Sequence, residues 1–491
     1  MTENKRLFRS AARWFCTLTF GLLWGAGLLA QTSQPSAPPA KPDQSESAGQ
    51  NAAAKNNTIS PQEAVELFGQ VDQILKFASK DSGLPTRHEV KRRLTNRDEV
   101  VSYLEKSMRE DKSAQRVQRS ELVLKKFGLL PRDFKLSSFL VALLREQIAG
   151  YYDPKTKTMN LLDWVPLEQQ RAVLAHELTH ALQDQSFNLE KWLKGGNGDL
   201  DKKKEIMPED IVADEADEVK EAVVEGQAET VMLDYILSPS GKSATDAPEV
   251  VEELDAAMTK GSPDSVEFQT APIFLKESLT FPYRYGVKFV TAVLKDEGKG
   301  KAFAGAFNNP PRLTRQIMEP RTYLSGETIA PMSLPDFKHD FKDYDRFDLG
   351  AIGEFDVSML IDQYAGVEES KQMYPSWRGG YYYSVLPKGN PSAPLGLLYV
   401  SRWANAEKAG KFAAIYAKSL TQRYKQVKQS DDNPDDLAKP DSLSGKHTWK
   451  TEDGAVEIDA QGDTVMVSES LDPATTETLR NDVFALASPV K

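Results

Sequence analysis

Residues 171–185, Arg171-Ala-Val-Leu-Ala-His-Glu-Leu-Thr-His-Ala-Leu-Gln-Asp-Gln185, place two imidazoles and a carboxylate on one face of a predicted helix. His176 and His180 are four residues apart, so on a helix they point the same way and can share one metal ion. Glu177 lies beside them, where a carboxylate can accept a proton from water whose pKa zinc lowers to about 7. The pattern therefore predicts a zinc site. Apolar residues on this helix recur at the spacing of a buried stripe: Leu167, Leu174, Ala175, Leu178, Ala181 and Leu182.

A catalytic zinc ion normally takes three protein ligands and keeps a fourth position open, so a third ligand must lie elsewhere in the chain. One known arrangement would need Gly at 183 and His at 186, but these positions hold Gln183 and Ser186. The next histidine, His339, is too remote to form a motif with the first two. The third ligand is therefore predicted to be a carboxylate. Asp184, one turn after His180, is one candidate, although a capping or ligand-orienting role suits it better.

The stronger candidate is Glu225, on an acidic helix predicted over residues 214–235. It lies between Val224 and Gly226 in the apolar part of that helix, and Gly226 would let another helix approach closely. Glu229 follows one turn later, where its carboxylate could accept the free N–H of a metal-bound imidazole. The same helix carries two acidic residues that we expect to face solvent, Glu218 and Glu221.

At this point the sequence resembles a known family. The string HELTHALQDQ, followed on the acidic helix by VEGQAE, is similar to the Glu-ligand, gluzincin-like HEXXH zinc metallopeptidases, and specifically to a group of secreted bacterial members. Three further segments resemble motifs of that group: residues 147–162, 281–286 and 309–320.

The resemblance implies an α+β, zincin-like fold with a mainly helical catalytic domain. It implies that His176, His180 and Glu225 hold one zinc ion per chain and that Glu177 is the general base. It also implies a β-hairpin over residues 147–162, directly before the zinc helix, with a strand at the edge of the cleft. An extended peptide substrate can add itself to such an edge by backbone hydrogen bonds.

The later motifs contain candidates for contact with the substrate or transition state. Tyr283, Arg284 and Tyr285 could face the negative charge that develops on a carbonyl oxygen, and we expect at least two of them to pack instead. Glu319 departs from the family pattern, because relatives tend to carry His before the proline of this motif. Glu319 is a fourth candidate for contact with the substrate or transition state, but an ionised carboxylate cannot donate a hydrogen bond to an oxyanion, so any such role of the histidine would not carry over to it.

The N-terminus has the layout of a secretory signal, because basic residues precede an apolar run over residues 14–30. We predict a signal peptide over residues 1–30 and, from its Pro, Ala and Ser content, a disordered linker over residues 31–58. The protein is then exported to the periplasm or the extracellular space, or stays anchored in the membrane if the signal is not cleaved. The one cysteine, Cys16, lies within the signal, so the mature chain has neither disulfides nor thiol chemistry.

Composition narrows the class of partner. The chain has 491 residues and a formal net charge of −11, so it lacks a general nucleic-acid footprint. We interpret its short basic run, Lys91-Arg92-Arg93, as solvated surface. The expected partner is a protein or peptide substrate, and no sequence feature specifies an oligomeric state.

The remainder of the chain is too long for one hydrophobic core. We predict a zincin-like metallopeptidase domain over residues 59–335 and a smaller C-terminal α+β domain over residues 336–491. Two polar segments, residues 188–209 and 238–265, are expected to be surface insertions, either mobile loops that gate the site or tolerated additions.

These observations favour an exported zinc metallopeptidase, and an endopeptidase in preference to an exopeptidase. Two alternatives share the metal site. One is a catalytically inactive, zinc-containing binding or assembly protein of the cell envelope, and the other is a hydrolase of a non-peptide amide. The intact Glu177 argues against the first alternative, whereas the sequence does not separate the second from a peptidase.

Overall fold

The computed structural model describes most of the chain after residue 58. The described residues are 59–100, 102, 113–147, 150–165, 167–194, 205–263, 265–430 and 441–487. The predicted signal peptide and linker, residues 1–58, lie outside them. Within these ranges, no helix is both long and apolar enough to cross a lipid bilayer.

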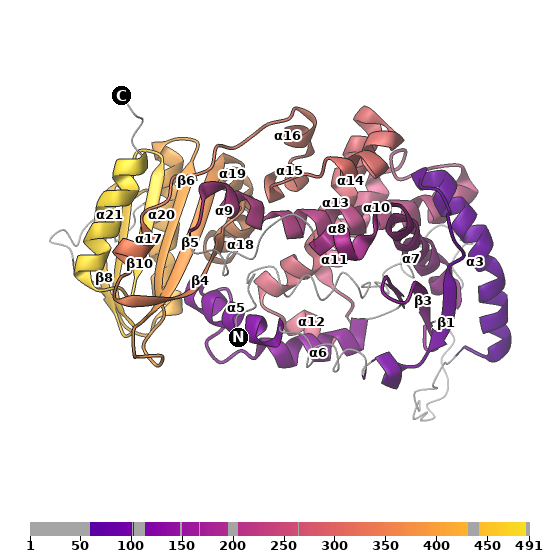
Figure 1. Ribbon diagram of the computed structural model, residues 1–491, viewed down its shortest axis with the longest axis horizontal. Coiled ribbons are helices and arrows are strands. Elements are labelled where there is room, and N and C mark those ends of the chain that lie inside the picture. Colours follow the sequence, from indigo (N-terminus) through magenta and orange to yellow (C-terminus); the bar gives the residue numbers. More distant parts are fainter. Residues whose placement is uncertain are drawn as a thin grey trace, which may run out of the picture.

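The protein has an α+β fold, 58% helical and 17% strand, with a sheet in its C-terminal part. Figure 1 shows a helical part, which contains α3 to α16, beside a second part built on the large sheet that begins with β4. One hydrophobic core contains buried residues from both parts, so the two parts pack against one another.

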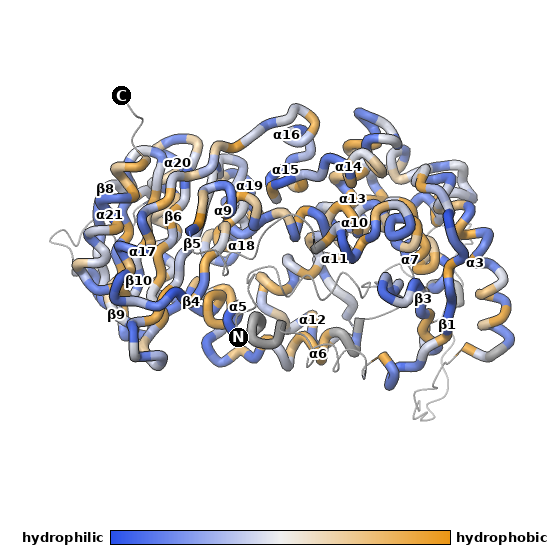
Figure 2. The backbone as a smooth tube through the Cα atoms, in the orientation of Figure 1, coloured by the Kyte–Doolittle hydropathy of each residue, from blue (hydrophilic) through white to orange (hydrophobic). Residues whose placement is uncertain are grey.

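The helices of the first part begin and end where the local sequence directs. Ser60 and Glu63 form a capping box at the start of α3, and Gly83, with a φ of 74°, ends that helix. Figure 2 shows hydrophobic segments of α3 alternating with hydrophilic ones, as in a helix with one buried face. The helices of this part are α3 (Pro61–Ser82), α5 (Ser113–Phe127), α6 (Leu136–Gln147), α7 (Leu167–Phe187), α8 (Leu189–Lys194), α9 (Pro208–Asp214), α10 (Ala216–Leu237), η1 (Ser238–Ser240), α11 (Pro248–Lys260), α12 (Val266–Thr270), α13 (Ile273–Glu297), η2 (Lys301–Gly305), α14 (Ala306–Asn308), α15 (Thr314–Met318) and α16 (Pro320–Leu324).

Helix α10 is the central helix of this part. It packs against α3, α7 and α13, and most of its residues are buried. It crosses α13 where Gly226 meets Gly286, and a Cβ atom added to Gly226 would lie 2.3 Å from the carbonyl carbon of Gly286. No side chain can occupy that space. The close helix approach predicted from Gly226 is therefore confirmed.

A three-stranded sheet lies beside α7. Its strand order is β1 (Lys91–Thr95), β3 (Thr158–Leu162) and β2 (Gly150–Asp153), with β1 parallel and β2 antiparallel to β3. Strands β2 and β3 form the predicted hairpin, and β2 is an edge strand of this sheet. The basic run from Lys91 to Arg93 forms the start of β1, and these two terminal residues of the run are exposed, as predicted.

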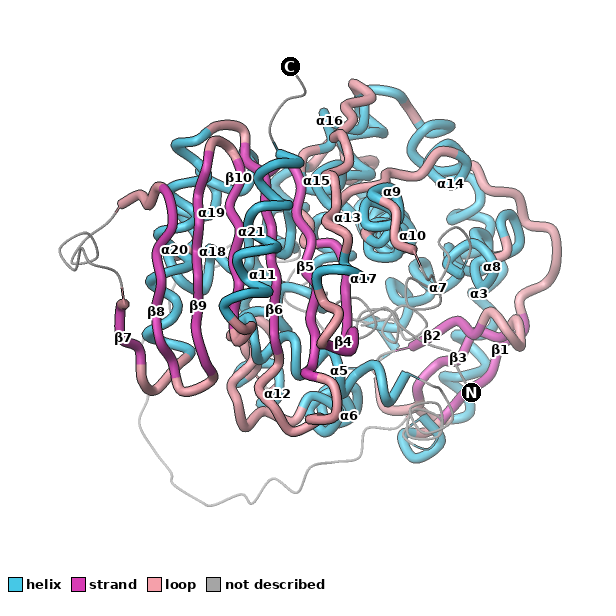
Figure 3. Tube along the Cα trace, turned by 60° about the vertical axis from the view of Figure 1, so that its left-hand side comes forward, coloured by secondary structure: helices cyan, strands magenta, loops and turns pink. Residues whose placement is uncertain are grey.

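The second part is built on a seven-stranded antiparallel sheet, seen in Figure 3. Its strand order is β4-β5-β6-β10-β9-β8-β7, so the last strand of the chain lies in the middle of the sheet. The sequence predicts strands within residues 377–384, 397–402 and 448–467, and the structure confirms them. The strands are β4 (Tyr344–Ala351), β5 (Trp377–Pro387), β6 (Gly396–Trp403), β7 (Val427–Gln429), β8 (Gly445–Thr451), β9 (Gly454–Gln461) and β10 (Thr464–Glu469).

Helices cover both faces of the large sheet. Side chains on each strand alternate between the faces: in β6, Leu398 belongs to a core cluster that includes α21, whereas Tyr399 belongs to the main core. The ring of Phe127, from α5, packs edge-on against Tyr399 and so joins the helical part to this face. Figure 3 shows α17 (Phe337–Asp340) and α21 (Pro473–Ala487) on one face, and α18 (Glu354–Ala365), α19 (Val367–Met373) and α20 (Ala406–Arg423) on the other.

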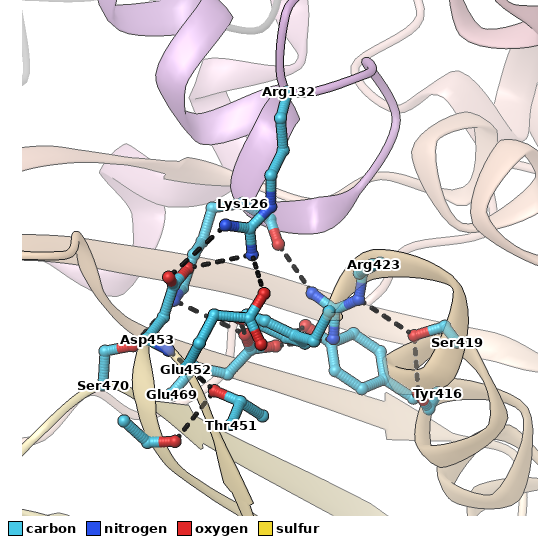
Figure 4. Close-up of polar contacts among 12 residues, drawn as sticks. Lys126, Arg132, Tyr416, Ser419, Arg423, Thr451, Glu452, Asp453, Glu469 and Ser470 are labelled. Carbon is cyan, nitrogen blue, oxygen red and sulfur yellow. Dashed lines mark hydrogen bonds and ion pairs between the residues drawn. The ribbon is translucent and has the colours of Figure 1, made fainter. Parts of the chain in front are cut away.

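A group of buried charges and hydroxyls also joins the two parts (Figure 4). Glu469, at the end of β10, accepts hydrogen bonds from Tyr416 and Arg423 of α20 and from Tyr424. Lys126, near the end of α5, lies 3.7 Å from Glu469, and its backbone carbonyl accepts a hydrogen bond of 2.6 Å from Arg423. We call these five residues the junction cluster.

The two polar segments expected to be surface insertions are only partly so. Segment 238–265 contains α11, in which Val251, Leu254 and Met258 are buried at helical spacing. This helix packs against α13, so the expectation of a loop or a tolerated addition is wrong there. Segment 188–209 begins with α8 and reaches the start of α9, and residues 195–204 lie outside the described part.

Candidate metal centre

Helix α7 positions the two predicted histidine ligands. Its apolar stripe is buried as predicted, with Leu174, Leu178 and Leu182 at 0% exposure, because the helix packs between α3, α10 and the β2–β3 hairpin. His176 and His180 are one turn apart and buried, with ring centroids separated by 4.8 Å.

Glu225 of α10 completes a group of three side chains. Its Oε2 atom lies 3.2 Å from Nε2 of His176 and 3.3 Å from Nε2 of His180. The structure thus brings the three predicted ligands together, and we call them the metal group. Among the described residues, no other set of three His, Cys, Asp or Glu side chains converges closely enough to share an ion.

Each imidazole faces an acceptor with its other nitrogen. Oε2 of Glu229 lies 3.2 Å from Nδ1 of His176, in the place expected for an orienting carboxylate. Oε1 of Gln183 lies 2.9 Å from Nδ1 of His180. Sequence reasoning missed Gln183, and its only signal was a position three residues after His180, on the same helical face. Both Nε2 atoms are thereby turned toward Glu225.

The charges of the metal group depend strongly on one another. Burial raises the pKa of Glu225, but the charges and hydrogen bonds of His180 and His176 outweigh burial and hold this pKa at about 2. Burial lowers the pKa of His176, but hydrogen bonds and charges from Glu225 and Glu229 raise it to about 10. The pKa of His180 is also raised, by Glu225 against the effect of burial. The group therefore attracts positive charge.

The geometry of the metal group fits a metal ion. When the Nδ1 atoms carry the imidazole protons, two nitrogen lone pairs and a carboxylate oxygen converge, and such atoms repel unless positive charge lies between them. Ligand atoms around a tetrahedral ion with bonds of about 2.0–2.1 Å lie about 3.3 Å apart. The distances from Oε2 of Glu225 to the two Nε2 atoms, 3.2 and 3.3 Å, match this spacing. Oε1 of Glu225 has no hydrogen-bond partner within the described residues.

Glu177 is placed beside the metal group by its neighbours on α7. It directly follows His176 and is 0% exposed. The first residue of β2 lies against it, because a Cβ atom added to Gly150 would be 3.8 Å from Cγ of Glu177. The edge strand of the small sheet therefore passes next to the predicted base.

Asp184 is turned away from the metal group. Its Oδ2 atom accepts hydrogen bonds from the hydroxyl of Tyr152 at 2.9 Å and from Nζ of Lys157 at 2.6 Å. Its Oδ1 atom accepts a hydrogen bond of 3.1 Å from the backbone N–H of Leu189. Asp184 thus joins the hairpin to α7 and caps the start of α8. This geometry supports the predicted capping role and not the alternative third ligand or a contact with a ligand histidine.

Of the three adjacent residues considered as transition-state contacts, Tyr283 lies at the metal group. Its ring is stacked near that of His176, with centroids 6.3 Å apart. Arg284 is paired with Asp255 at 2.6 Å, and Tyr285 packs in an aromatic cluster. Two of the three residues therefore pack elsewhere, as expected, and Tyr283 is the remaining candidate.

Glu319 belongs to a separate network between α15 and α18. Arg315 pairs with Glu319 at 3.0 Å, with Glu327 at 3.0 Å and with Glu354 at 2.6 Å. Burial, together with the charge of Glu319, raises the pKa of Glu354 to about 8. The contact that the structure gives Glu319 is thus an ion pair that supports packing.

The acidic residues of α10 that were expected to face solvent do not. Glu218 is 6% exposed and Glu221 is 2% exposed. The prediction is wrong because α3, α7 and α13 enclose α10, so the helix has no solvated face over this stretch.

No model of a known protein family, no curated protein and no solved structure matches this chain.

Proposed function

We propose that this protein is a zinc metallopeptidase. The observation that carries the proposal is the convergence of His176, His180 and Glu225, with Glu177 next to them on α7. Two imidazole nitrogens and one carboxylate oxygen are a ligand set of catalytic zinc sites, because they leave a fourth position open. A structural zinc site is instead closed by four protein ligands.

Each of these side chains has a defined task in the proposed reaction. A bound zinc ion supplies a Lewis acid that polarises a carbonyl group and lowers the pKa of water to about 7. Glu177 accepts a proton from the attacking water and delivers it to the leaving amine. Glu229 accepts the Nδ1 proton of His176 and so keeps Nε2 directed to the centre.

The edge strand β2 supports a peptide as the substrate. Within the described residues β2 is an edge strand of its sheet, and an extended chain can add itself to a strand of this kind by backbone hydrogen bonds. Gly150, at the start of β2, lies against Glu177, so a peptide on this edge would pass the base. Pairing of this kind reads the backbone, so we expect cleavage inside unstructured segments, as by an endopeptidase.

The remaining parts of the proposal concern location and organisation. The layout of residues 1–30 supports export to the periplasm or the extracellular space, with residues 31–58 as a linker. Residues 59–335 would form the zincin-like catalytic domain. Residues 336–491 would form the smaller α+β domain, whose sheet packs on the helical part through the junction cluster.

The test replaces the proposed base without changing a metal ligand. Glu177→Gln keeps the size of the side chain and removes the proton acceptor. We expect cleavage of an unstructured protein such as casein to fall at least about a hundredfold, with one zinc ion per chain and the melting temperature unchanged. The matched control is Glu252→Gln on α11, a side chain that is 69% exposed, and it should cleave as wild type does.

Equal cleavage by wild-type protein and Glu177→Gln would contradict the proposal, because it would point to another base or to a contaminating protease. A different outcome is zinc bound by both proteins with cleavage by neither, on casein, a peptide library and envelope extracts. That result would favour a zinc-containing binding or assembly protein, or a hydrolase of non-peptide amides.

A further inference from the structure

The amide of Gln183 links the metal group to the helix behind it. Gln183 lies three residues after His180 and is 0% exposed. Its Oε1 atom lies 2.9 Å from Nδ1 of His180, whereas its Nε2 atom donates to the carbonyl oxygen of Val224 and to Oε1 of Gln227, both at 3.0 Å. Val224 directly precedes Glu225, so this one amide connects the segments that carry two of the three ligands.

A second amide determines the direction of the first. Nε2 of Gln227, whose side chain is also 0% exposed, donates to the carbonyl oxygens of Ala302 at 2.8 Å and Phe303 at 3.1 Å. Both belong to η2, a π-helical turn, which is a rare geometry found frequently at functional sites. A carbonyl oxygen can only accept a hydrogen bond. Nε2 of Gln227 must therefore face η2, and its Oε1 atom must face Gln183.

The same reasoning locates the proton on His180. Nε2 of Gln183 faces two acceptors, the carbonyl of Val224 and Oε1 of Gln227. Oε1 of Gln183 is then an acceptor toward His180, and an imidazole nitrogen that faces an acceptor carries the proton. Nδ1 of His180 is therefore protonated, which leaves Nε2 of the neutral ring to act as a ligand.

We propose that Gln183 is a positioning residue for the metal ion. Gln227 and η2 hold the Gln183 amide in the orientation that directs Nε2 of His180 toward the metal position. This inference rests on the proposed zinc site but not on the reaction at that site. The two histidines are held differently, because His176 faces the carboxylate of Glu229 and His180 faces a neutral amide. A carboxylate accepts through either oxygen, whereas a carboxamide accepts through one atom only. The second amide is therefore needed to keep that atom toward His180.

The main test is Gln183→Met, which removes the acceptor at a similar side-chain length. We expect zinc affinity, measured by competition with a chromophoric chelator, to fall about 10–100-fold, as on loss of other orienting partners. Nitrogen-15 NMR of the imidazoles gives a second readout, since the chain has only 5 histidines. In wild-type protein we expect a proton on Nδ1 of His180 with and without zinc, and in Gln183→Met this proton should exchange faster with water.

We call the hydrogen-bonded amides of Gln183 and Gln227 the amide relay. Two further variants distinguish an effect of this relay from an effect on packing. Gln227→Met keeps the acceptor but frees the Gln183 amide to rotate, so we expect a smaller loss of zinc affinity than in Gln183→Met. Gln185→Met is the matched control. Gln185 lies on the same helix and makes three hydrogen bonds to the backbone of Arg87 and His88. Gln185→Met should keep the wild-type zinc affinity and the wild-type signals of His180.

A wild-type His180 that carries its proton on Nε2 alone would overturn the inference. So would an unchanged zinc affinity in Gln183→Met, or an equal loss in Gln183→Met and Gln185→Met, which would indicate a packing effect. These readouts do not involve hydrolysis, so failure of the Glu177→Gln test leaves them standing. If no zinc binds at all, the proposed function fails, and a proton on Nδ1 in the metal-free chain still supports the relay, whereas a bare Nδ1 overturns it.

Discussion

Glu225 and Glu469 are two buried carboxylates whose pKa values are lowered by different kinds of positive neighbour. Both are 0% exposed. In each case burial raises the pKa, and neighbouring positive groups outweigh it and hold the pKa at about 2. Glu225 lies in the metal group on α10, and Glu469 lies in the junction cluster at the end of β10.

Glu469 is neutralised by cations of the chain, of which Arg423 is permanently charged. Arg423 lies 2.8 Å away and Lys126 lies 3.7 Å away, and the hydroxyl of Tyr416 donates a hydrogen bond of 2.7 Å. The guanidinium of an arginine keeps its charge under all ordinary conditions. The junction cluster is therefore complete without any group from outside the protein.

Glu225 lies instead between two imidazoles, each of which directs its Nδ1 proton to another acceptor. Its positive neighbours are these imidazoles, which carry a second proton when no metal is bound and release it when a metal ion takes the place of that proton. The difference teaches how to interpret a buried carboxylate. A buried carboxylate beside an arginine is neutralised by the fold itself, whereas one between two imidazoles lies where a metal ion can replace a proton, which marks a candidate binding site.

The largest expected effect comes from Glu225→Ala, which should lose the metal ion. Two histidines alone leave a zinc ion without its third protein ligand, so zinc content should fall from one per chain to near zero by elemental analysis. Asp184→Ala is the matched control, because Asp184 bonds to the hairpin and α8 rather than to the metal group. It should keep one zinc ion. Loss of zinc in Asp184→Ala with retention in Glu225→Ala would reverse the assignment.

Glu469→Gln should leave zinc binding intact and weaken the fold. The substitution leaves Arg423 buried without its partner, and breaking such a pair costs about 3–5 kcal/mol. Urea unfolding should show a decrease of this size in the free energy of unfolding. A loss of zinc in Glu469→Gln, with no loss of stability, would break the comparison between the two carboxylates.

The pH dependence of stability in wild-type protein and in Glu469→Gln tests whether the charge of Glu469 stabilises the fold. Its pKa is about 2 in the folded chain, below the ordinary value of 4.5. A lowered pKa stabilises the fold above about pH 4.5, and this contribution is lost as the pH falls toward about 2. The stability difference between wild-type protein and Glu469→Gln should therefore shrink across this range. A constant difference would show that ionisation of Glu469 is not its source.

Arg132→Ala should have the smallest effect, although Arg132 also joins the two parts. Its side chain is 48% exposed and pairs with Asp453 at 3.1 Å and with Glu452 at 3.5 Å. Ion pairs at exposed sites contribute less than about 1 kcal/mol because water screens them. Urea unfolding should detect a change below this limit. A loss as large as that of Glu469→Gln would show that burial does not distinguish the two contacts.

The metal ligands could be predicted because each is marked by residues close to it in the sequence. His176 and His180 share a helical face through their spacing, and Gly226, beside Glu225, indicated a close helix crossing that the structure contains. The strands of the large sheet within residues 377–384, 397–402 and 448–467 were predicted for a similar reason, whereas β7 was not predicted. Apolar segments bounded by turn residues such as Asp453-Gly454 predict strands without knowledge of their partners.

Burial and side-chain direction could not be predicted because they depend on distant contacts. Glu218 and Glu221 have the pattern of a solvated face, and only the packing of α3, α7 and α13 encloses them. Asp184 has suitable spacing for a ligand, but its carboxylate accepts a hydrogen bond from Tyr152 of the hairpin, a contact that the local sequence does not reveal. Gln183 depends, through a second amide, on two carbonyl groups of η2, which no spacing rule connects to α7.

The central place of β10 makes the large sheet depend on a strand that is synthesised after the six others. Strands β4 to β6 can pair as they emerge, and so can β7 to β9, but within the sheet these two halves are hydrogen-bonded to one another only through β10. Glu469 belongs to that strand, so the ion pairs of Lys126 and Arg423 with Glu469 also form only after β10 has been synthesised. A chain that stops before β10 therefore lacks the middle of its sheet and exposes two unpaired strand edges, which favour aggregation and recognition by chaperones and proteases. The order of the strands thus makes a chain that lacks β10 distinguishable from one that contains it.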